Sequence, residues 1–341
     1  MKHVAFGRTG MSVSRLCLGT MPLGHQCDDT QSVAILDTAA EHGFTFIDTA
    51  DAYPQGAALE QRGETERIIG RWMTDRGNRD DLVLATKFFA PMGPQTWQRG
   101  GSRKHVMSAI DASLRRLQTD YVDLYQIHFP DDRTPIEETL GALDDIVRAG
   151  KVRYIGCSNF SSWQLARSNG IAAAGGLHRF DSVQPRYNLL FRNYERDLFD
   201  LCELDDIAVI PYNPLAGGLL TGKHGRNTKP EQGTRFALGT TGDRYRQRYW
   251  NDLEFDGVDA VRAIAAEAGV DMVELAVAWM LANPVVTAPI IGASKPDQLA
   301  ASVAALDLAL DADVLSALSE ATHHFRQREH QLQPRLAPKH E

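Results

Sequence analysis

Residues 122–150, with the sequence VDLYQIHFPDDRTPIEETLGALDDIVRAG, predict a strand followed by a helix. The first segment, Val122–His128, is short and rich in β-branched and aromatic residues, as strands are. The second segment, Thr134–Gly150, has one apolar stripe at helical spacing, formed by Ile136, Leu140, Leu143 and Val147. Together they predict one strand–helix unit in which the apolar face of the helix packs against the sheet.

The sequence also predicts where this helix begins and ends. Thr134 and Glu137 form a T-x-x-E capping box at its start. Pro135 takes the first helical position, where the missing N–H costs nothing. Gly150 supplies a left-handed stop. We therefore expect the helix to begin at Pro135 and to end before Gly150.

Runs of the same strand type recur along the chain, and each is followed by a helical segment. The eight runs are Arg15–Thr20, Phe44–Ala50, Leu82–Lys87, Val122–His128, Val152–Asn159, Ser182–Tyr187, Ala208–Asn213 and Ala288–Ala293. Eight such units predict an α/β chain that forms a single closed (β/α)8 barrel, or TIM barrel, over residues 1–322. An open, doubly wound parallel sheet is the alternative. We expect a long polar insertion at about 221–256 and a flexible C-terminal tail at 323–341.

Length and composition agree with one globular domain. The chain has 341 residues, of which 43% are hydrophobic and 23% charged, and these values exclude fibrous and disordered proteins. Its formal net charge of −8 offers no broad basic surface for nucleic acid or an anionic membrane. The four cysteines form no C-x-x-C pair, so a disulfide framework and a zinc ribbon are poorly supported. Without a signal-peptide or membrane-span pattern, we expect a cytoplasmic protein with no bound metal, as a monomer or a homo-oligomer.

Polar side chains stand at the C-terminal ends of the expected strands, where a barrel of this kind carries its active face. Asp48 and Lys87 end adjacent strands, so each supplies the other with a partner for a buried charge. Tyr53 lies in the loop after Asp48, and the Lys87 ammonium would lower its pKa and make it an acid near neutrality. His128 ends the following strand and is a candidate to orient a substrate or handle a proton. A structural ion pair and a core histidine are the alternative interpretations.

The sequence also resembles the aldo-keto reductases over nearly its whole length. The resemblance rests on an ordered set of motifs: FGRTG near the start, GFTFIDTADAY (43–53), ATK (85–87), QIH (126–128), GKVRYIGCSNF (150–160), VQPRYN (183–188), PYNPLAGGLLTGK (211–223) and IIGASKPDQL (290–299). It implies a barrel that binds NADPH without a Rossmann domain. It also implies reversible reduction of a small aldehyde or ketone, by hydride transfer from the nicotinamide with Tyr53 as general acid. The catalytic tetrad that it implies is Asp48, Tyr53, Lys87 and His128.

The resemblance assigns further residues to the cofactor. The nicotinamide carboxamide, which needs donors and acceptors together, would meet Ser158, Asn159 and Gln184. Tyr212 would stack on the nicotinamide ring. Backbone N–H groups would bind the pyrophosphate at Leu215, Gly217 and Leu219. The other implied cofactor residues are Gly19, Thr20, Met21, Asp48, Asn213, Pro214, Lys223, Arg235, Gly292, Ser294, Lys295, Gln298 and Ser302. The basic members of this set favour NADPH over NADH.

The substrate side is less fully specified. Aromatic residues that follow strand ends are candidates for the pocket wall or else for the core: Phe88, Phe89, Phe129, Tyr187 and Trp250. Three departures from the family pattern bear on the pocket. Residues 54–66, PQGAALEQRGETE, replace a short glycine-containing loop and a Ser-Glu helix start, Asn213 replaces a serine, and Ser302 replaces an asparagine that meets the adenine.

Two other functions are alternatives. A redox-sensing barrel protein, like the channel-associated β subunits, would hold NADPH with little turnover, but the complete tetrad speaks against it. A barrel hydrolase or aldolase would use Lys87 as a Schiff-base former, but Asp48 would keep that lysine protonated. Residues 217–223 nearly match a P-loop, yet His224 stands where Ser or Thr must bind Mg²⁺, and no G-x-G-x-x-G follows a strand.

Overall fold

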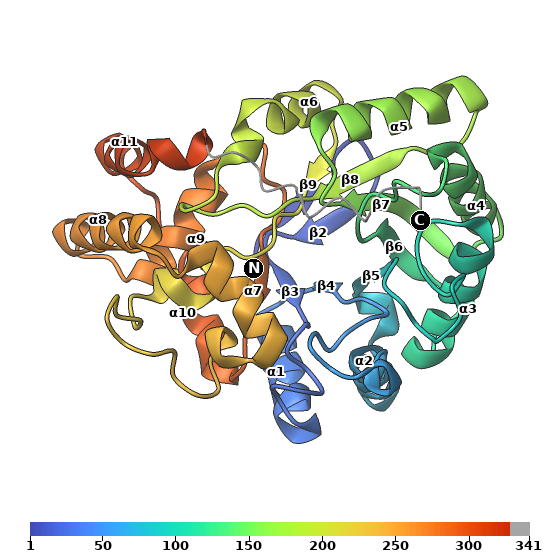
Figure 1. Cartoon of the computed structure of the whole chain (residues 1–341), viewed down its shortest axis with the longest axis horizontal. Coiled ribbons are helices and arrows are strands. Elements are labelled where there is room, and N and C mark those ends of the chain that lie inside the picture. Colours follow the sequence, from blue (N-terminus) through green and yellow to red (C-terminus); the bar gives the residue numbers. More distant parts are fainter. Residues whose placement is uncertain (328–341) are drawn as a thin grey trace.

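Eight short strands pair in parallel around a closed barrel in the computed structural model, which describes residues 1–327 (Figure 1). They are β3 (Cys17–Gly19), β4 (Phe46–Asp48), β5 (Val83–Phe88), β6 (Val122–Ile127), β7 (Val152–Ser158), β8 (Phe180–Gln184), β9 (Ala208–Val209) and β10 (Ile290–Gly292). Neighbours pair in that order, and β10 pairs with β3. The sheet closes through bonds from the N–H of Thr287 to the carbonyl of Val209 (2.8 Å) and from the N–H of Ile290 to that of Pro211 (2.8 Å). The predicted (β/α)8 barrel is confirmed, and the open sheet is excluded.

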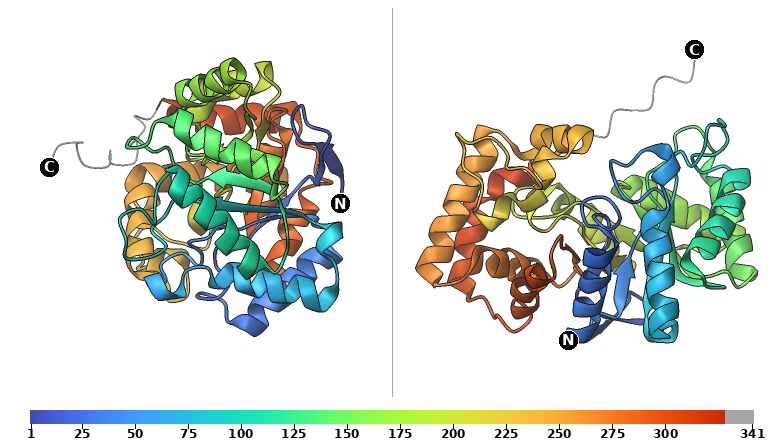
Figure 2. Two further views of the ribbon diagram at one scale, coloured as in Figure 1. Left: turned by 90° about the vertical axis from the view of Figure 1, so that its right-hand side faces the viewer. Right: turned by 90° about the horizontal axis from the view of Figure 1, so that it is seen from below.

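Helices form the outer layer of the barrel (Figures 1 and 2). They are α1 (Asp29–Glu41), α2 (Glu64–Arg76), α3 (Arg103–Leu117), α4 (Ile136–Arg148), α5 (Ser162–Gly175), α6 (Leu198–Leu204), α7 (Gly239–Tyr249), α8 (Asp252–Ala268), α9 (Met272–Ala282), α10 (Leu299–Ala304) and α11 (Ala312–Ala321). Short 3-10 segments are η1 (Leu59–Gln61), η2 (Arg79–Asp81), η3 (Asn193–Arg196), η4 (Ala216–Thr221), η5 (Arg235–Ala237), η6 (Pro296–Gln298) and η7 (His323–Arg326). The apolar faces of the helices bury the outer faces of the strands in one continuous cluster.

Helix α4 matches the predicted apolar stripe but not the predicted start. Leu140 and Leu143 are fully buried, and Gly150 has φ of 74°, which confirms the left-handed stop. The capping box is wrong, because Pro135 is the N-cap and has no side-chain cap. The Thr134 hydroxyl instead donates to Oδ2 of Asp131 at 2.8 Å. A carboxylate three residues earlier is the stronger acceptor and draws this hydroxyl away from the helix end.

A short antiparallel hairpin, which we did not predict, precedes the barrel. It consists of β1 (His3–Ala5) and β2 (Ser12–Ser14). Phe6 and Val13 are fully buried and cluster with residues that point into the barrel. The Phe6 ring meets the ring of Phe46, at the start of β4, edge-on at 5.9 Å. The hairpin therefore closes the barrel at the N-terminal ends of the strands.

The expected polar insertion at 221–256 is largely ordered. It contains η5, α7 and the start of α8. Phe236, Tyr245 and Tyr249 are buried, and the Phe236 ring lies 4.9 Å from the Trp250 ring. These spaced aromatic residues give an otherwise polar segment an apolar side that packs onto the barrel.

The expected start of the tail, at His323, is also wrong. Residues 323–326 form η7, and Phe325 is fully buried. The N–H of Arg192 donates to the carbonyl of Phe325 at 3.1 Å, which attaches this turn to the barrel. The rest of the expected tail, 328–341, lies outside the described residues.

Three general properties of the described residues bear on function. Within residues 1–327, no helix combines the length and the apolar character needed to cross a membrane. The four cysteines are free thiols and are buried. Over the same residues, no group of three or more His, Cys, Asp or Glu side chains is placed to hold a metal ion.

Candidate active site

A pocket of about 1140 Å³ opens at the C-terminal ends of the strands, opposite the hairpin. This volume exceeds that of most sites for drug-sized ligands and suits a dinucleotide together with a substrate. Two segments far apart in the sequence meet over it. A Cβ atom on Gly56 would lie 3.0 Å from Oγ1 of Thr241, so the loop after β4 touches α7, and both residues line the pocket.

The register of the sheet brings Asp48 and Lys87 together. Asp48 is opposite Ala85, and Lys87 follows two residues later on the same face of β5. The Lys87 ammonium donates to Oδ2 of Asp48 at 2.5 Å and to the carbonyl of Thr49 at 2.9 Å. Both side chains are buried. The predicted ion pair is therefore present, and its burial makes each charge depend on the other.

Gln126 belongs to the same network, although we did not predict it. It lies opposite Lys87 in the register of β5 and β6. Its Nε2 donates to Oδ1 of Asp48 at 3.1 Å, and Nε2 of Gln184 donates to the same oxygen at 2.9 Å. The sequence contained a signal for this role: Gln126 is a polar residue within an apolar strand. It stands two residues before His128 and therefore on the same inward face.

Tyr53 and His128 complete the group. The Lys87 ammonium lies 5.1 Å from the centre of the Tyr53 ring. The rings of Tyr53 and His128 are 6.0 Å apart and meet edge-on. His128 stacks on Phe129 at 4.7 Å, which fixes the plane of the imidazole. The structure thus brings the four predicted catalytic side chains together: Asp48, Tyr53 and His128 line the pocket, and Lys87 is buried beside Asp48.

Burial sets the protonation states of these groups. It raises the pKa of Tyr53 above 10, and the opposing effect of the Lys87 ammonium is smaller. Our prediction of a lowered Tyr53 pKa is therefore wrong, because desolvation of the phenolate outweighs the nearby charge. Burial, with help from Lys87, holds the pKa of His128 well below 6.5. Burial lowers the pKa of Lys87, but Asp48, together with Tyr53 and Cys17, more than offsets this, so the net direction is upward. At neutral pH the site holds an ammonium, a neutral imidazole and a protonated phenol.

Amide and hydroxyl groups adjoin the tetrad on the next two strands. Nδ2 of Asn159 donates to the carbonyl of His128 at 2.9 Å, and its Oδ1 accepts from the Tyr212 hydroxyl at 2.9 Å. The Ser158 hydroxyl donates to the backbone carbonyl of Gln184 at 2.8 Å. Within residues 1–327, Oε1 of Gln184 accepts no hydrogen bond, so it is available to an amide N–H.

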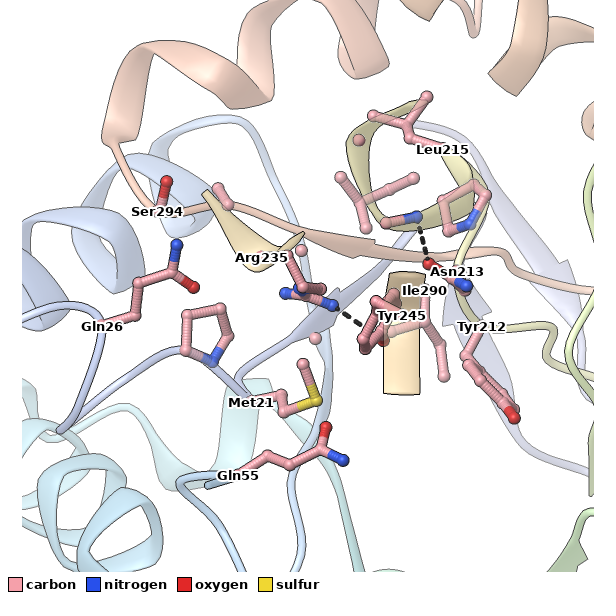
Figure 3. Close-up of a pocket in the computed structure, with 18 of the residues that line it drawn as sticks. Met21, Gln26, Gln55, Tyr212, Asn213, Leu215, Arg235, Tyr245, Ile290 and Ser294 are labelled. Atoms are coloured by element: carbon pink, nitrogen blue, oxygen red, sulfur yellow. Dashed lines mark hydrogen bonds between the residues drawn. The ribbon is translucent and has the colours of Figure 1, made fainter. Parts of the chain in front are cut away.

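Most of the residues assigned to the cofactor line the pocket (Figure 3). Those that do are Gly19, Thr20, Met21, Asp48, Ser158, Asn159, Gln184, Tyr212, Asn213, Pro214, Leu215, Gly217, Lys223, Arg235, Gly292, Ser294, Gln298 and Ser302. Leu219 and Lys295 do not, because Leu219 is fully buried in the core and Lys295 is exposed. The N–H of Gly217 donates to Oδ1 of Asn213 at 2.7 Å, so it is already engaged.

The aromatic candidates for the substrate pocket divide between the pocket and the core. Phe129 lines the pocket. Phe88 is fully buried and stacks on Tyr125 at 4.9 Å, because side chains alternate along β5 and Lys87 takes the inward position. Tyr187 is buried against Trp279 at 5.0 Å. Assigning Phe88 and Tyr187 to the pocket was therefore wrong, and Phe89 and Trp250 also lie outside it.

Helix α7 contributes pocket residues that we did not predict. Its inner face carries Thr241, Arg244, Tyr245 and Arg248. Their spacing of three and four residues is that of one helix face. Figure 3 shows Tyr245 beside Arg235, whose Nη1 donates to the Tyr245 hydroxyl at 3.3 Å. From the loop after Tyr53, Gln55 and Arg62 also line the pocket.

A barrel whose strand ends join a buried Lys–Asp pair to a tyrosine and a histidine defines a class of barrel oxidoreductase. The model of the Aldo/keto reductase family matches residues 15–323, and the chain belongs to this family.

Relatives agree with that assignment. The chain is 38% identical over 329 residues to the oxidoreductase YrpG of Bacillus subtilis (strain 168), covering 94% of this chain and 95% of that protein. It is 35% identical over 315 residues to a probable voltage-gated potassium channel subunit beta of Arabidopsis thaliana, with 90% and 92% covered. It is 32% identical over 330 residues to norsolorinic acid reductase A of Aspergillus parasiticus, with 92% and 78% covered. Family and relatives support an oxidoreductase that acts on small molecules.

Proposed function

We propose that this protein is an NADPH-dependent reductase that converts aldehydes or ketones to alcohols and runs in reverse as an alcohol dehydrogenase. The observation that supports this most directly is the meeting of Asp48, Tyr53 and His128 in one pocket, with the buried Lys87 ammonium in contact with Asp48 and beside the Tyr53 ring. A buried ammonium beside a protonated phenol is suited to proton donation.

The pocket has the donor set that a nicotinamide dinucleotide requires. Oε1 of Gln184 is available to the carboxamide, and Tyr212 offers a ring face beside it. Lys223 and Arg235 line the pocket and would bind the phosphates, including the 2'-phosphate that distinguishes NADPH. When bound, the cofactor supplies a hydride to the carbonyl carbon.

The protein residues manage the proton. Tyr53 gives its hydroxyl proton to the carbonyl oxygen, which His128 helps to position. The Lys87 ammonium, 5.1 Å from the centre of the Tyr53 ring, stabilises the resulting phenolate; two opposite unit charges about 5 Å apart attract by about 3 kcal/mol at an effective dielectric of 20. Asp48 keeps Lys87 charged and oriented, so the phenolate forms opposite a fixed positive charge.

The test is Tyr53→Phe. We expect the rate of carbonyl reduction to fall by about 100-fold or more, because general acid catalysis contributes that much. NADPH affinity, measured by fluorescence titration, should stay close to that of the wild type. Tyr121→Phe, at a tyrosine outside the pocket, is the control. Near wild-type reduction by the Tyr53 variant would show that another group donates the proton.

A regulatory barrel that binds NADPH with little turnover is the second candidate, since the chain is similar to a potassium channel subunit beta. Steady-state NADPH consumption with a panel of aldehydes, ketones, quinones and sugars separates the two functions. Repeated turnover supports the reductase, whereas a single slow oxidation of bound NADPH supports the regulatory protein.

A further inference from the structure

The pocket concentrates positive charge in a protein whose net charge is −8. Among residues 1–327, five cationic side chains line it: Arg62, Lys223, Arg235, Arg244 and Arg248. The acidic side chains that line it are Asp48, Asp271 and Glu274. Asp48 is paired with Lys87, and Asp271 caps α9 by accepting from the N–H of Val273 at 2.7 Å. The remaining field in the pocket therefore favours anions.

Arg235 belongs to the end of the pocket where the cofactor phosphates are proposed to lie. Nε2 of Gln26 donates to the carbonyl of Gly233 at 2.7 Å, and Sγ of Cys27 donates to the carbonyl of Ser294 at 3.5 Å. These bonds attach the Arg235 segment to the region of Ser294. Figure 3 shows Arg235 between Ser294 and Tyr245.

Arg248 has a different environment. Its guanidinium carbon lies 6.0 Å from the centre of the Tyr245 ring. It is close enough to Tyr212 to oppose the burial-driven rise in the pKa of that phenol. In the described part of the chain, its guanidinium has no carboxylate partner and donates no hydrogen bond. A half-buried cation without an anionic partner thus lies near Tyr212, whose ring is proposed to face the nicotinamide.

The face of α7 that carries Arg248 also carries Tyr245, which lies close enough to Tyr53 to add to the burial-driven rise in the pKa of that phenol. Thr241, two turns earlier on this face, lies against Gly56, three residues beyond Tyr53. Arg244 lies one turn before Arg248 and adds a second positive charge to the pocket wall. An anion bound by Arg248 would therefore lie on the substrate side of the pocket. A few carbon atoms would be enough to join it to a carbonyl group at the tetrad.

We propose that Arg248 anchors an anionic group of the substrate, so that the preferred substrates are aldehydes or ketones that also carry a carboxylate. This inference rests on the proposed reductase function. A guanidinium binds a carboxylate through two parallel N–H donors, which orients the bound molecule as well as attracting it. The carboxylate takes no part in the reaction: the carbonyl carbon receives the hydride and the carbonyl oxygen receives the proton of Tyr53.

The test compares succinate semialdehyde with butanal, a neutral aldehyde of equal chain length. We expect the wild type to have the higher kcat/KM for succinate semialdehyde. Arg248→Met should lower that value by about 10- to 100-fold, the loss expected for a charge-assisted bond, and change the value for butanal little. Arg248→Lys should recover part of the preference. An equal loss with both aldehydes would overturn the proposal.

Arg186→Met is the matched control. Arg186 is also half-buried and cationic, but its guanidinium carbon lies 3.5 Å from the Phe191 ring and the residue does not line the pocket. Its loss should leave the ratio of the two kcat/KM values unchanged. A similar drop in that ratio for Arg186→Met would show that the preference for the anionic aldehyde comes from the overall electrostatic field of the protein. That result would overturn the specific role of Arg248.

A binding measurement separates this inference from the proposed function. Succinate, which is not reducible, is titrated calorimetrically into the protein with NADP⁺ present. Binding by the wild type that Arg248→Met abolishes supports the anion site, even if neither aldehyde is reduced and the reductase proposal fails. Reduction of butanal without succinate binding overturns the anion site and leaves the reductase intact. Weaker NADPH binding by Arg248→Met would place the guanidinium on the cofactor and also overturn it.

Discussion

Replacing Asp48 by asparagine tests how far Lys87 depends on its carboxylate. The asparagine oxygen can still accept from Gln126 and Gln184, which now donate to Oδ1 of Asp48. The new NH2 group would face the Lys87 ammonium, where Oδ2 now accepts at 2.5 Å. The substitution therefore removes one charge and one acceptor and leaves Lys87 with the carbonyl of Thr49.

The magnitude follows from two limits. At 2.5 Å and an effective dielectric of 20, the ion pair contributes about 7 kcal/mol of attraction. The variant can avoid part of that loss by releasing the Lys87 proton. At pH 7 this costs about 4 to 5 kcal/mol for a group whose ordinary pKa is about 10.4. We therefore expect Asp48→Asn to lose about 3 to 5 kcal/mol of unfolding free energy, as broken buried pairs do.

The same reasoning gives the pH dependence. In the variant, a neutral folded Lys87 binds no proton while the unfolded lysine does, so stability relative to the wild type rises by up to about 1.4 kcal/mol per pH unit. Urea unfolding followed by circular dichroism at pH 7 and pH 9 measures the difference. Lys87→Met in the Asp48→Asn background should recover much of the loss. Asp145→Asn, which breaks the exposed pair with Arg103, should lose less than about 1 kcal/mol.

Two results would refute this account. One is a loss below about 1 kcal/mol for Asp48→Asn at pH 7. The other is an equal loss at pH 7 and pH 9, which would show that Lys87 keeps its proton without the carboxylate and that other groups hold its charge.

Three further predictions follow from burial and backbone conformation. Because burial raises the pKa of Tyr53, the rate of reduction should stay level from about pH 6 to 9, while the rate of alcohol oxidation rises with pH. A reduction rate that already falls as the pH is raised toward 8 would contradict this. Burial lowers the pKa of His105 to about 4. Acidification from pH 6.5 to 4 should therefore remove about 2 to 3 kcal/mol of unfolding free energy, since only the unfolded state binds that proton. His105→Leu should flatten this slope, and an unchanged slope would disprove the assignment. Gly217→Ala should lower Tm more than Gly233→Ala. Both glycines have positive φ, of 74° and 80°, but a Cβ on residue 217 would lie 2.6 Å from the Tyr245 ring, whereas one on residue 233 would meet open space. Equal losses of Tm would show that the backbone conformation alone, and not the clash with Tyr245, sets the effect.

The strand pattern was sufficient to predict the barrel, but strand lengths depended on tertiary contacts. In the run Ala208–Asn213 only Ala208–Val209 form a continuous strand, and Tyr212 forms isolated bridges, because Pro211 between them has no N–H to donate. The hairpin was missed, since its three-residue strands are too short to show a pattern and gain their stability by burying Phe6 and Val13 against the barrel.

The tetrad could be predicted because parallel strands in a barrel end on the same face, whichever helices surround them. Residues such as Phe88 could not be assigned by position after a strand, since one step along the strand reverses the direction of the side chain. The pocket arginines were missed for another reason. Residues 239–249 are polar and begin with glycine, so the apolar signal of a helix is weak, and only packing onto η4 and η5 reveals the inner face.

Among residues 1–327, the hairpin of β1 and β2 closes the N-terminal end of the barrel and leaves the pocket open at the C-terminal ends of the strands. With Phe6 and Val13 filling the N-terminal end, molecules that bind at the strand ends arrive and leave by the same route, through the pocket that Gly56 and Thr241 help to line. When two molecules bind in the pocket, the outer one blocks the exit of the inner one, so the last to bind is the first to leave.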